Sequence, residues 1–320
     1  MEKFPTMDPQ LLFRLEKAVN RRAPLRQVTN AIRLINHEAG LEGLTLEEYD
    51  RHFVLQVFAE KWLAQRETLT WFVKDTLGGK YLIVKDRSQS SAAVPGAIKT
   101  GVWINEWLSS AVVQEHGLKF AVDLNDALNS GLFLDMRHNR KLVGGLAKGR
   151  KVLNGFSYTC SFGVHCRLGG AQSAINVDIS AKALARGRAN YELNALNPRR
   201  EEFIRSDILT YLKRALKSGA RFDLIILDPP SFSQFEGKTF RVKKNLPVLL
   251  ELAIRVLNPK GVLFASTNLS TFTHTELERM VHVAARQRPI KKLQRLGQDA
   301  DFTGTHQGPE SHMAAVLVDL

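Results

Sequence analysis

The chain of 320 residues is long enough for two average domains, and its 44% hydrophobic and 24% charged residues are ordinary for a globular protein. This composition excludes a disordered chain, a collagen-like fibre and a disulfide-stapled miniprotein. The 45 Lys and Arg residues exceed the 32 Asp and Glu residues, which gives a net charge of +13 and favours a polyanionic partner such as nucleic acid. A basic protein without such a partner is the alternative, because net charge bears on association and not on fold.

The cysteines and the N-terminus bear on compartment. Cys160 and Cys166, the two cysteines, form no CxxC pair and have no second Cys or His pair at zinc-finger spacing. We therefore expect no metal site and a reducing compartment. The sequence begins without an apolar leader and has no stretch of the ~20 apolar residues that a membrane span needs. These features predict a cytoplasmic protein without a membrane partner.

Before residue 150 the chain favours one helix and several short strands. Apolar residues at helical spacing predict a basic helix over 11–22. Runs rich in β-branched and aromatic residues then predict strands at 53–58, 69–73, 80–84 and 118–122, with a helix over 59–67. We expect a basic helical extension over 1–32 and a small mixed α/β domain over 33–140.

After residue 150 strands and helices alternate. Continuous apolar runs predict strands that are buried on both faces, at 151–154, 172–178, 202–205, 222–228 and 261–266. Helices are expected between them, at 180–195, 208–217 and 245–257, with Pro247 in the first turn of the last one. The alternation predicts a doubly wound, Rossmann-like α/β domain over 141–320.

Residues suited to binding a nucleoside follow the first three strands. Small and hydroxyl residues over 154–163 let a ligand approach the backbone before a helix that begins near Phe162. Asp178 can accept both hydroxyls of a ribose, and Asp207 can reach an adenine amino group. The alternatives are an ordinary βα connection for the turn, and helix caps at Asp178 or Ser180 and at Asp207.

The fourth strand ends in the motif Asp228-Pro-Pro-Ser-Phe232. Because proline fixes φ and lacks an N–H donor, Asp228 and the neighbouring carbonyls form a surface that accepts hydrogen bonds, which suits an amino group on a base. Phe232 could stack on that base, a contact worth about 1–3 kcal/mol. A proline-rich turn that only packs a loop is the alternative.

These residues resemble class I S-adenosylmethionine-dependent methyltransferases and, more closely, the I/K-type 23S (large-subunit) ribosomal RNA methyltransferases. The resemblance extends from about residue 21 to 320 and rests on five segments in the same order: 33–44, 131–140, 152–159, 176–184 and 222–232. It implies an enzyme with a mostly parallel seven-stranded sheet, S-adenosyl-L-methionine as cofactor and ribosomal RNA as partner.

The resemblance also implies roles for single residues. The resemblance places ten residues around the methionine part, the ribose, the adenine and the sulfonium of the cofactor. They are Phe156, Ser157, Tyr158, Thr159, Asp178, Ile179, Ser180, Asp207, Ile208 and Asp228. At the target base it places Asp228, Pro229, Pro230 and Phe232.

The chain departs from the family pattern at three places. The family's cofactor turn usually has Tyr-Thr-Gly where this chain has Tyr158-Thr159-Cys160. The family's Gln-Lys-Thr-Gly is replaced by Leu128-Asn-Ser-Gly131, although Asp135 and Arg137 remain. Many members have an N-terminal RNA-binding module that we expect to be missing here, so other segments must contact RNA.

Four basic segments could contact phosphates: 137–151, 199–200, 238–244 and 286–295. Solvated helix faces are the alternative for each of them. The segment 238–244 is the best candidate, because it contains an aromatic residue and follows the Pro-Pro turn. We expect substrate contacts from Arg137, Lys238, Arg241, Lys243 and Lys244.

The position of the cysteines bears on the atom that is methylated. Methylation at C5 of a pyrimidine needs a nucleophile, normally a Cys thiolate, that adds to C6. The family's C5 members carry this Cys after the fifth strand, where this chain has Ala265-Ser-Thr-Asn268. Nitrogen methylation needs only a positioned lone pair. We therefore expect methylation of a base nitrogen of 23S ribosomal RNA, for example guanine N7.

Three other functions stay open: a cytosine-C5 methyltransferase of ribosomal RNA, a methyltransferase for a protein or small molecule, and a non-catalytic RNA-binding assembly factor. The oligomeric state is open as well, with a homodimer as one option.

Overall fold

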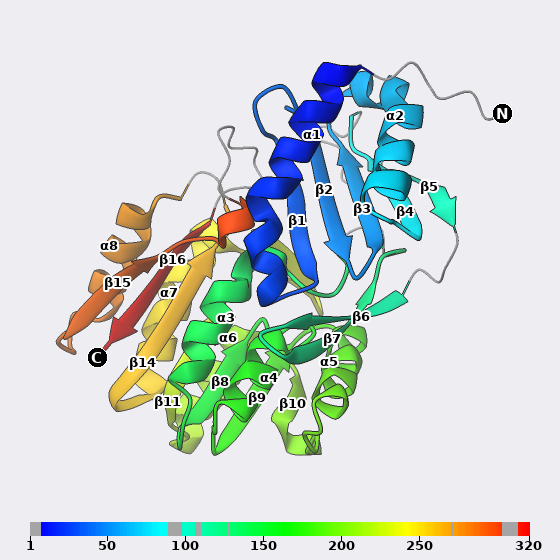
Figure 1. Ribbon diagram of the computed structural model, residues 1–320. Helices are drawn as coiled ribbons and strands as arrows, with labels where there is room; N and C mark the ends of the chain where they lie inside the picture. Colours follow the sequence, from blue (N-terminus) through cyan, green and yellow to red (C-terminus); the bar gives the residue numbers. More distant parts are fainter. Residues whose placement is uncertain (1–7, 89–97, 106–109, 127–128, 270–271, 303–312) are drawn as a thin grey trace. The chain divides into compact units, whose positions relative to one another are not determined.

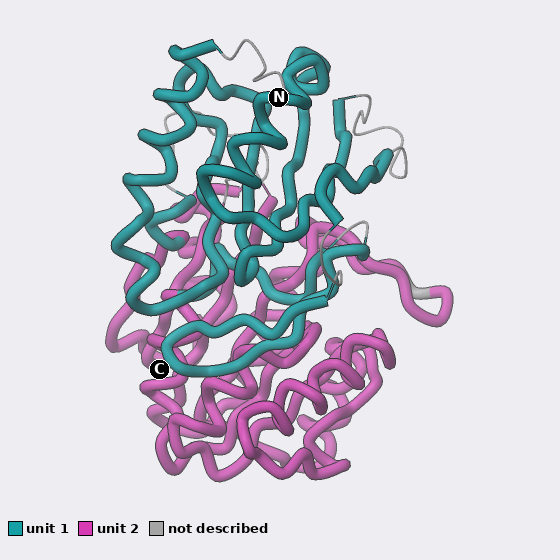
Figure 2. Tube along the Cα trace, turned by 45° about the vertical axis from the view of Figure 1, so that its right-hand side comes forward, with its two compact units in different colours: residues 1–137, 299–308 teal, residues 138–298, 309–320 magenta. Residues whose placement is uncertain are grey.

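The computed structural model describes residues 8–88, 98–105, 110–126, 129–269, 272–302 and 313–320. The chain divides into two compact units (Figure 2): unit 1 is Met1–Arg137 with Asp299–Gly308, and unit 2 is His138–Gln298 with Pro309–Leu320. This division differs from the expected one, because the first helix belongs to unit 1 and a C-terminal segment returns to that unit. None of the helices within the described ranges combines the length and apolar character that a membrane crossing requires.

Unit 1 contains a five-stranded mixed sheet with the order β1-β2-β3-β4-β5. Only β3 and β4 run parallel to each other. The five strands are β1 (Ala31–Asn36), β2 (Leu44–Tyr49), β3 (His52–Val57), β4 (Tyr81–Asp86) and β5 (Lys99–Asn105). Helix α1 (Pro9–Arg22) begins after Asp8, whose carboxylate accepts the Gln10 N–H, and it lies along β1 (Figure 1). Its buried residues Leu11, Leu15 and Ala18 join the core of the sheet.

The other elements of unit 1 include one correction. They are η1 (Ala23–Gln27), η2 (Glu60–Gln65), α2 (Arg66–Trp71), η3 (Phe72–Thr76), β6 (Ser110–Glu115), β7 (Leu118–Asp123), η4 (Leu134–Met136) and η6 (Ala300–Phe302). The run 69–73, expected as a strand, is helical, and the helix expected over 59–67 begins as a 3₁₀ helix. Leu69, Phe72 and Val73 are buried at helical spacing, and a short apolar run cannot distinguish a buried helix from a strand.

Buried charges hold residues 299–302 against β1 within unit 1. The fully buried carboxylate of Asp301 accepts the Arg33 backbone N–H at 2.9 Å. It also accepts two hydrogen bonds from the Arg137 guanidinium, at 3.1 and 3.3 Å. The same guanidinium pairs with Asp299 at 2.9 Å. Arg22 of α1 donates to the Asp301 backbone carbonyl, so that the network joins segments far apart in sequence.

Unit 2 is built on a seven-stranded sheet with the order β10-β9-β8-β11-β14-β16-β15. The first five strands in this order are parallel, and β16 is antiparallel to both of its neighbours. The strands are β8 (Lys151–Gly155), β9 (Ser173–Asp178), β10 (Phe203–Arg205), β11 (Phe222–Leu227), β14 (Leu257–Thr267), β15 (Lys292–Leu296) and β16 (Ala314–Asp319). The predicted Rossmann-like fold is therefore confirmed.

Helices cover both faces of this sheet (Figure 1). Helix α4 packs on α5, whereas α6, α7 and α8 pack on one another in succession. The remaining elements are α3 (Arg137–Gly145), α4 (Ser161–Leu168), α5 (Ala181–Leu193), η5 (Arg200–Glu202), α6 (Ile208–Ser218), β12 (Phe232–Phe235), β13 (Lys238–Arg241), α7 (Val242–Val256) and α8 (His274–Ala284). Pro247 lies inside α7 and not in its first turn, because the helix already begins at the buried Val242.

Candidate active site

The residues expected to bind a nucleoside and a base lie at one edge of the unit 2 sheet. Strand β8 has β9 on one side and β11 on the other, so the chain reverses its winding direction there. In open α/β sheets, ligands bind beyond the carboxyl ends of the strands at such a switch point. The turn 156–160, residues 178–180, residues 207–208 and residues 228–232 follow β8, β9, β10 and β11 respectively.

The turn after β8 is strained and firmly held. Phe156, Tyr158 and Cys160 have φ values of 57°, 48° and 61°, in the left-handed region that non-glycine residues rarely adopt. Each such residue costs about 1–3 kcal/mol and persists only where its surroundings hold it, most often at functional sites. The Asn190 side chain, buried in α5, donates to the Thr159 carbonyl at 3.0 Å. Sequence reasoning missed this anchor.

Two glycines make room around the turn. Cys160 stands where the resembled family usually has glycine, and its buried side chain points at Gly187 of α5. A Cβ at Gly187 would come within 2.3 Å of Cys160 Sγ, so the bulk added at one position is accommodated at the other. At the end of β8, a Cβ on Gly155 would lie 2.9 Å from Ile208 Cδ1. Neither glycine belongs to a G-x-G-x-x-G pattern, which is why the sequence did not reveal them.

The Asp178 carboxylate is fixed by backbone N–H groups. Its Oδ2 accepts the Tyr158 N–H and its Oδ1 accepts the Ser180 N–H, both at 2.8 Å. Burial raises the pKa of Asp178 above its ordinary value, and these hydrogen bonds offset that rise only in part. Ser180 caps α5 by accepting the Ala183 N–H at 3.1 Å. The carboxylate of Asp178 thus keeps lone pairs that can accept hydroxyl groups.

Asp207 caps a helix, which was the alternative to its expected contact with adenine. Its Oδ1 accepts the Thr210 N–H at 2.9 Å and caps α6. This bond uses one lone pair of one oxygen, so the capping role is compatible with a ligand at Oδ2. The following residue, Ile208, is buried beside Gly155.

A serine from the neighbouring strand orients Asp228. Ser266 of β14 is fully buried, and its Oγ donates to Asp228 Oδ1 at 2.7 Å. Three residues after Asp228, Ser231 Oγ donates to Asn268 Oδ1 at 3.1 Å. The sequence did not point to Ser266, although it lies in the segment 265–268, where the C5 enzymes of the family carry their cysteine. Only the register of β14 beside β11, which the sequence does not reveal, shows that Ser266 lies next to Asp228.

The hairpin of β12 and β13 carries an exposed aromatic ring. Phe232 is 51% exposed, and the Arg241 guanidinium lies 5.8 Å from its ring centroid. On the same hairpin, Phe240 packs against Phe156 with 5.1 Å between ring centroids, which connects the hairpin to the strained turn. Lys243 and Lys244 are exposed at the start of α7, whereas the side chain of Lys238 lies outside the described residues.

Comparison with known proteins decides the family. Residues 55–317 match the family of S-adenosylmethionine-dependent methyltransferases. The chain belongs to this family. Ribosomal RNA large subunit methyltransferase I of Aeromonas salmonicida is 34% identical over 315 residues, which cover 96% of this chain and 79% of that protein. Ribosomal RNA large subunit methyltransferase K of Neisseria meningitidis serogroup B is 34% identical over 264 residues, which cover 82% and 71%.

Solved structures agree with this result. A crystal structure of a protein described as a methyltransferase, complexed with SAH (S-adenosylhomocysteine), superposes with a TM-score of 0.84 at 25% identity. The match covers 99% of this chain and 83% of that one. The present methyltransferase therefore depends on S-adenosylmethionine and is related to the large-subunit ribosomal RNA methyltransferases I and K, as the resemblance implied.

The structure contradicts one expected substrate contact of this methyltransferase. Arg137 was expected to bind RNA, but it is only 1% exposed and lies in unit 1. Its guanidinium is engaged by Asp299, Asp301 and the Ala31 carbonyl. The acidic partners lie more than 160 residues away in sequence, so spacing could not reveal them. Arg137 is a structural residue of unit 1.

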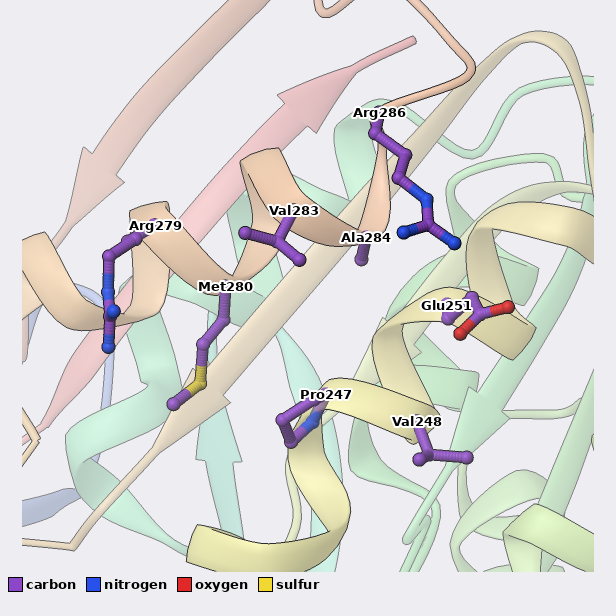
Figure 3. Close-up of a pocket in the computed structure, with 8 residues that line it drawn as sticks. All are labelled: Pro247, Val248, Glu251, Arg279, Met280, Val283, Ala284 and Arg286. Atoms are coloured by element: carbon purple, nitrogen blue, oxygen red, sulfur yellow. The ribbon is translucent and has the colours of Figure 1, made fainter.

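Unit 2 has a groove that is lined by residues other than those at the strand ends. The groove of about 310 Å³ lies between α7 and α8, and Figure 3 shows Met280 and Pro247 on its opposite walls. Its lining residues are Pro247, Val248, Glu251, Arg279, Met280, Val283, Ala284 and Arg286. None of these residues was expected at the cofactor or the base. We assign the groove no part in methyl transfer.

Asp178→Asn should weaken the affinity for S-adenosylmethionine about 10- to 100-fold, because a charge-assisted hydrogen bond contributes about 1.5–3 kcal/mol. The amide would also turn a donor toward the N–H of Tyr158 or Ser180. Cofactor binding needs the ionised carboxylate, and the pKa of Asp178 is raised. As the pH is lowered, the affinity of the wild-type enzyme should therefore begin to fall at a higher pH than it would if Asp178 had an ordinary pKa. Calorimetric titration across pH measures both effects.

A matched variant separates this effect from a general loss of charge. Asp223→Asn changes a carboxylate near the start of β11 that bonds to the Lys151 N–H and to Asn258. This variant should keep both the affinity and its pH dependence. An Asp178→Asn enzyme with wild-type affinity would remove Asp178 from the cofactor site.

Proposed function

We propose that this methyltransferase transfers a methyl group to a base nitrogen of 23S ribosomal RNA. The observation that carries the proposal is the Asp228 carboxylate, which Ser266 orients at the end of β11 beside the Pro-Pro turn and the exposed Phe232. The net charge of +13 and the names of the two bacterial relatives support RNA as the substrate.

The strand-end residues fit the cofactor. The two oxygens of Asp178 are oriented by backbone N–H groups and would accept the ribose hydroxyls. Asp207 and Ile208 would contact the adenine, and the turn from Phe156 to Thr159 would surround the methionine part. When bound, S-adenosylmethionine supplies an electrophilic methyl group. The rigid turn keeps its backbone in place before the cofactor arrives, because Asn190 and Asp178 already hold it.

The protein's part in the reaction is to place a nitrogen lone pair in line with the methyl carbon. Asp228 would accept a hydrogen bond from an amino or imino group of the base, and Ser266 fixes the carboxylate for this task. Pro229 and Pro230 keep the turn rigid, and Phe232 would stack on the base. A target base inside an RNA helix must first be flipped out. Arg241, Lys243 and Lys244 would contact phosphates next to it.

The cysteines favour nitrogen over cytosine C5. Both are fully buried, and they are the only cysteines in the sequence. Burial raises the pKa of Cys166 to about 12 and that of Cys160 still further, so that neither is a thiolate at neutral pH. Residues 265–268, where a C5 enzyme of the family has its cysteine, are Ala-Ser-Thr-Asn. A thiolate that could add to a pyrimidine is therefore not available at these positions.

Cys160→Ala and Cys166→Ala should each retain methyl transfer close to the wild-type rate. The reason is that nitrogen methylation forms no covalent bond between enzyme and base. Initial rates with labelled cofactor, together with denaturing gels that reveal covalent RNA adducts, check this. A covalent adduct that disappears in either variant would contradict nitrogen methylation.

The substrate class is tested with radiolabelled S-adenosylmethionine and three acceptors from a strain that lacks this gene: 23S RNA, 16S RNA and total ribosomal protein. We expect label in 23S RNA only, and no label with Asp228→Asn. Label in protein would favour a protein substrate. Cofactor binding without transfer to any acceptor would favour an assembly factor.

A further inference from the structure

A basic groove with an exposed aromatic ring lies on α1 in unit 1, whereas the strand-end site belongs to unit 2. The groove has a volume of about 650 Å³. The residues that matter here are Phe13, Arg14, Lys17, Ala18, Arg21 and Glu38. Phe13 is 65% exposed, whereas Leu11, Leu15 and Ala18 of the same helix are buried.

The charge of the α1 groove is positive. Arg14, Lys17 and Arg21 follow one another at spacings of three and four residues, so they share one side of the helix over roughly 10 Å. All three are exposed, and they form no ion pair within the described part of the chain. Glu38 is the acidic residue among those lining the groove, and it is already engaged by Arg22 and by the Asn36 N–H.

The stem of Arg14 lies directly on backbone. A Cβ at Gly40 would come within 2.8 Å of both Cδ and Nη1 of Arg14, so the missing side chain at Gly40 lets the arginine lie flat there. Gly40 has a φ of 79°, a conformation that also favours glycine. The absence of a side chain at Gly40 thus leaves room for the Arg14 guanidinium at the groove.

We propose that the α1 groove binds single-stranded RNA, with phosphates on Arg14, Lys17 and Arg21 and a base stacked on Phe13. A row of cations beside an exposed ring is the combination by which proteins hold single strands. An acidic protein segment would use the cations but would not need the ring. The inference rests on the proposed RNA substrate and adds a second contact surface to the one beside Phe232.

The test is fluorescence anisotropy of an unstructured, labelled RNA oligonucleotide at several salt concentrations. Arg14→Ala/Lys17→Ala/Arg21→Ala should weaken binding and lower the slope of log affinity against log salt by about 2, since each phosphate contact on a single strand contributes about 0.7. Phe13→Ala should weaken binding about tenfold with the slope unchanged. Phe13→Tyr, which keeps the ring, should bind like wild type.

A matched control removes three exposed cations from unit 2. Lys213→Ala/Arg214→Ala/Lys217→Ala changes exposed residues of α6 and gives the same net charge as the α1 triple variant. It should bind RNA with an affinity and salt slope close to wild type. Circular dichroism checks that every variant is folded.

The outcomes separate this inference from the proposed function. If wild type binds RNA and the α1 triple variant behaves like the α6 control, the α1 groove is not an RNA site, although the proposed function stands. If wild type does not bind the oligonucleotide, the inference is overturned, whereas the proposed function is decided separately by methyl transfer to 23S RNA. If polyglutamate competes with RNA for the α1 cations and Phe13→Ala has no effect, the groove binds an acidic protein and the inference is overturned.

Discussion

Asp228→Asn should lower kcat for methyl transfer at least about 100-fold and leave cofactor affinity nearly unchanged. The carboxylate would lose its negative charge, and with it the strong acceptor that orients the base, a loss comparable to removing one preorganised polar group from an active site. Ser266 Oγ now donates to Asp228 Oδ1 at 2.7 Å, so the amide would also face this hydroxyl in place of a carboxylate oxygen. Single-turnover transfer from labelled cofactor, with a separate titration of the cofactor, measures both quantities.

Two variants show whether the effect belongs to the oriented carboxylate. Ser266→Ala keeps Asp228 but removes the hydrogen bond that fixes it, so we expect a smaller loss of kcat, about tenfold. Asp223→Asn changes a carboxylate near the other end of β11 and should leave kcat unchanged. Retained turnover in Asp228→Asn would mean that the base binds elsewhere.

Asp301→Ala should lower the free energy of unfolding of unit 1 by about 3–5 kcal/mol. Asp301 and Arg137 are 0% and 1% exposed, and removing one partner of a buried pair leaves the other charge without compensation. The substitution also removes the acceptor of the Arg33 N–H. Urea unfolding followed by tryptophan fluorescence reports on this unit, because all four tryptophans of the sequence lie before residue 137.

An exposed charge on the same unit is the control for this loss. Glu16→Ala on α1 removes an exposed carboxylate and should change the free energy of unfolding by less than about 0.5 kcal/mol. If Asp301→Ala cost as little as Glu16→Ala, the Arg137 guanidinium would not depend on its buried partners. Arg137 would then return as a candidate for contact with RNA.

The five parallel strands of unit 2 could be predicted from the sequence because their signal is local, whereas β12, β13, β15 and β16 were not expected. Residues 224–227 of β11, for example, are continuously apolar and buried, as burial on both faces of a sheet requires. In unit 1, the sequence did not predict β1, β2, β5 or β6. In β1 and β2, buried polar residues interrupt the apolar pattern. Arg33 of β1 and Glu47 of β2 are buried and pair with each other across the two strands. Only the folded arrangement makes such positions part of a core.

In the candidate site, the positions of the three aspartates could be predicted, because they follow strands with a local signal. Asp178, Asp207 and Asp228 follow strands that the sequence reveals, and parallel strands end at one edge of a sheet. The contacts that hold these residues come from elsewhere along the chain. Ser266 reaches Asp228 from β14, and Asn190 reaches the turn from α5. Pairings over such distances leave no pattern in a single sequence.

The most direct test of the account is nucleoside analysis by mass spectrometry of 23S RNA methylated in vitro by the wild-type enzyme. The RNA comes from a strain that lacks this gene, and the methyl group of the cofactor carries a heavy isotope. The account predicts a heavy methyl group on a base nitrogen, as in 7-methylguanosine, and its absence with Asp228→Asn. Heavy 5-methylcytidine, or 23S RNA without the isotope, would contradict it.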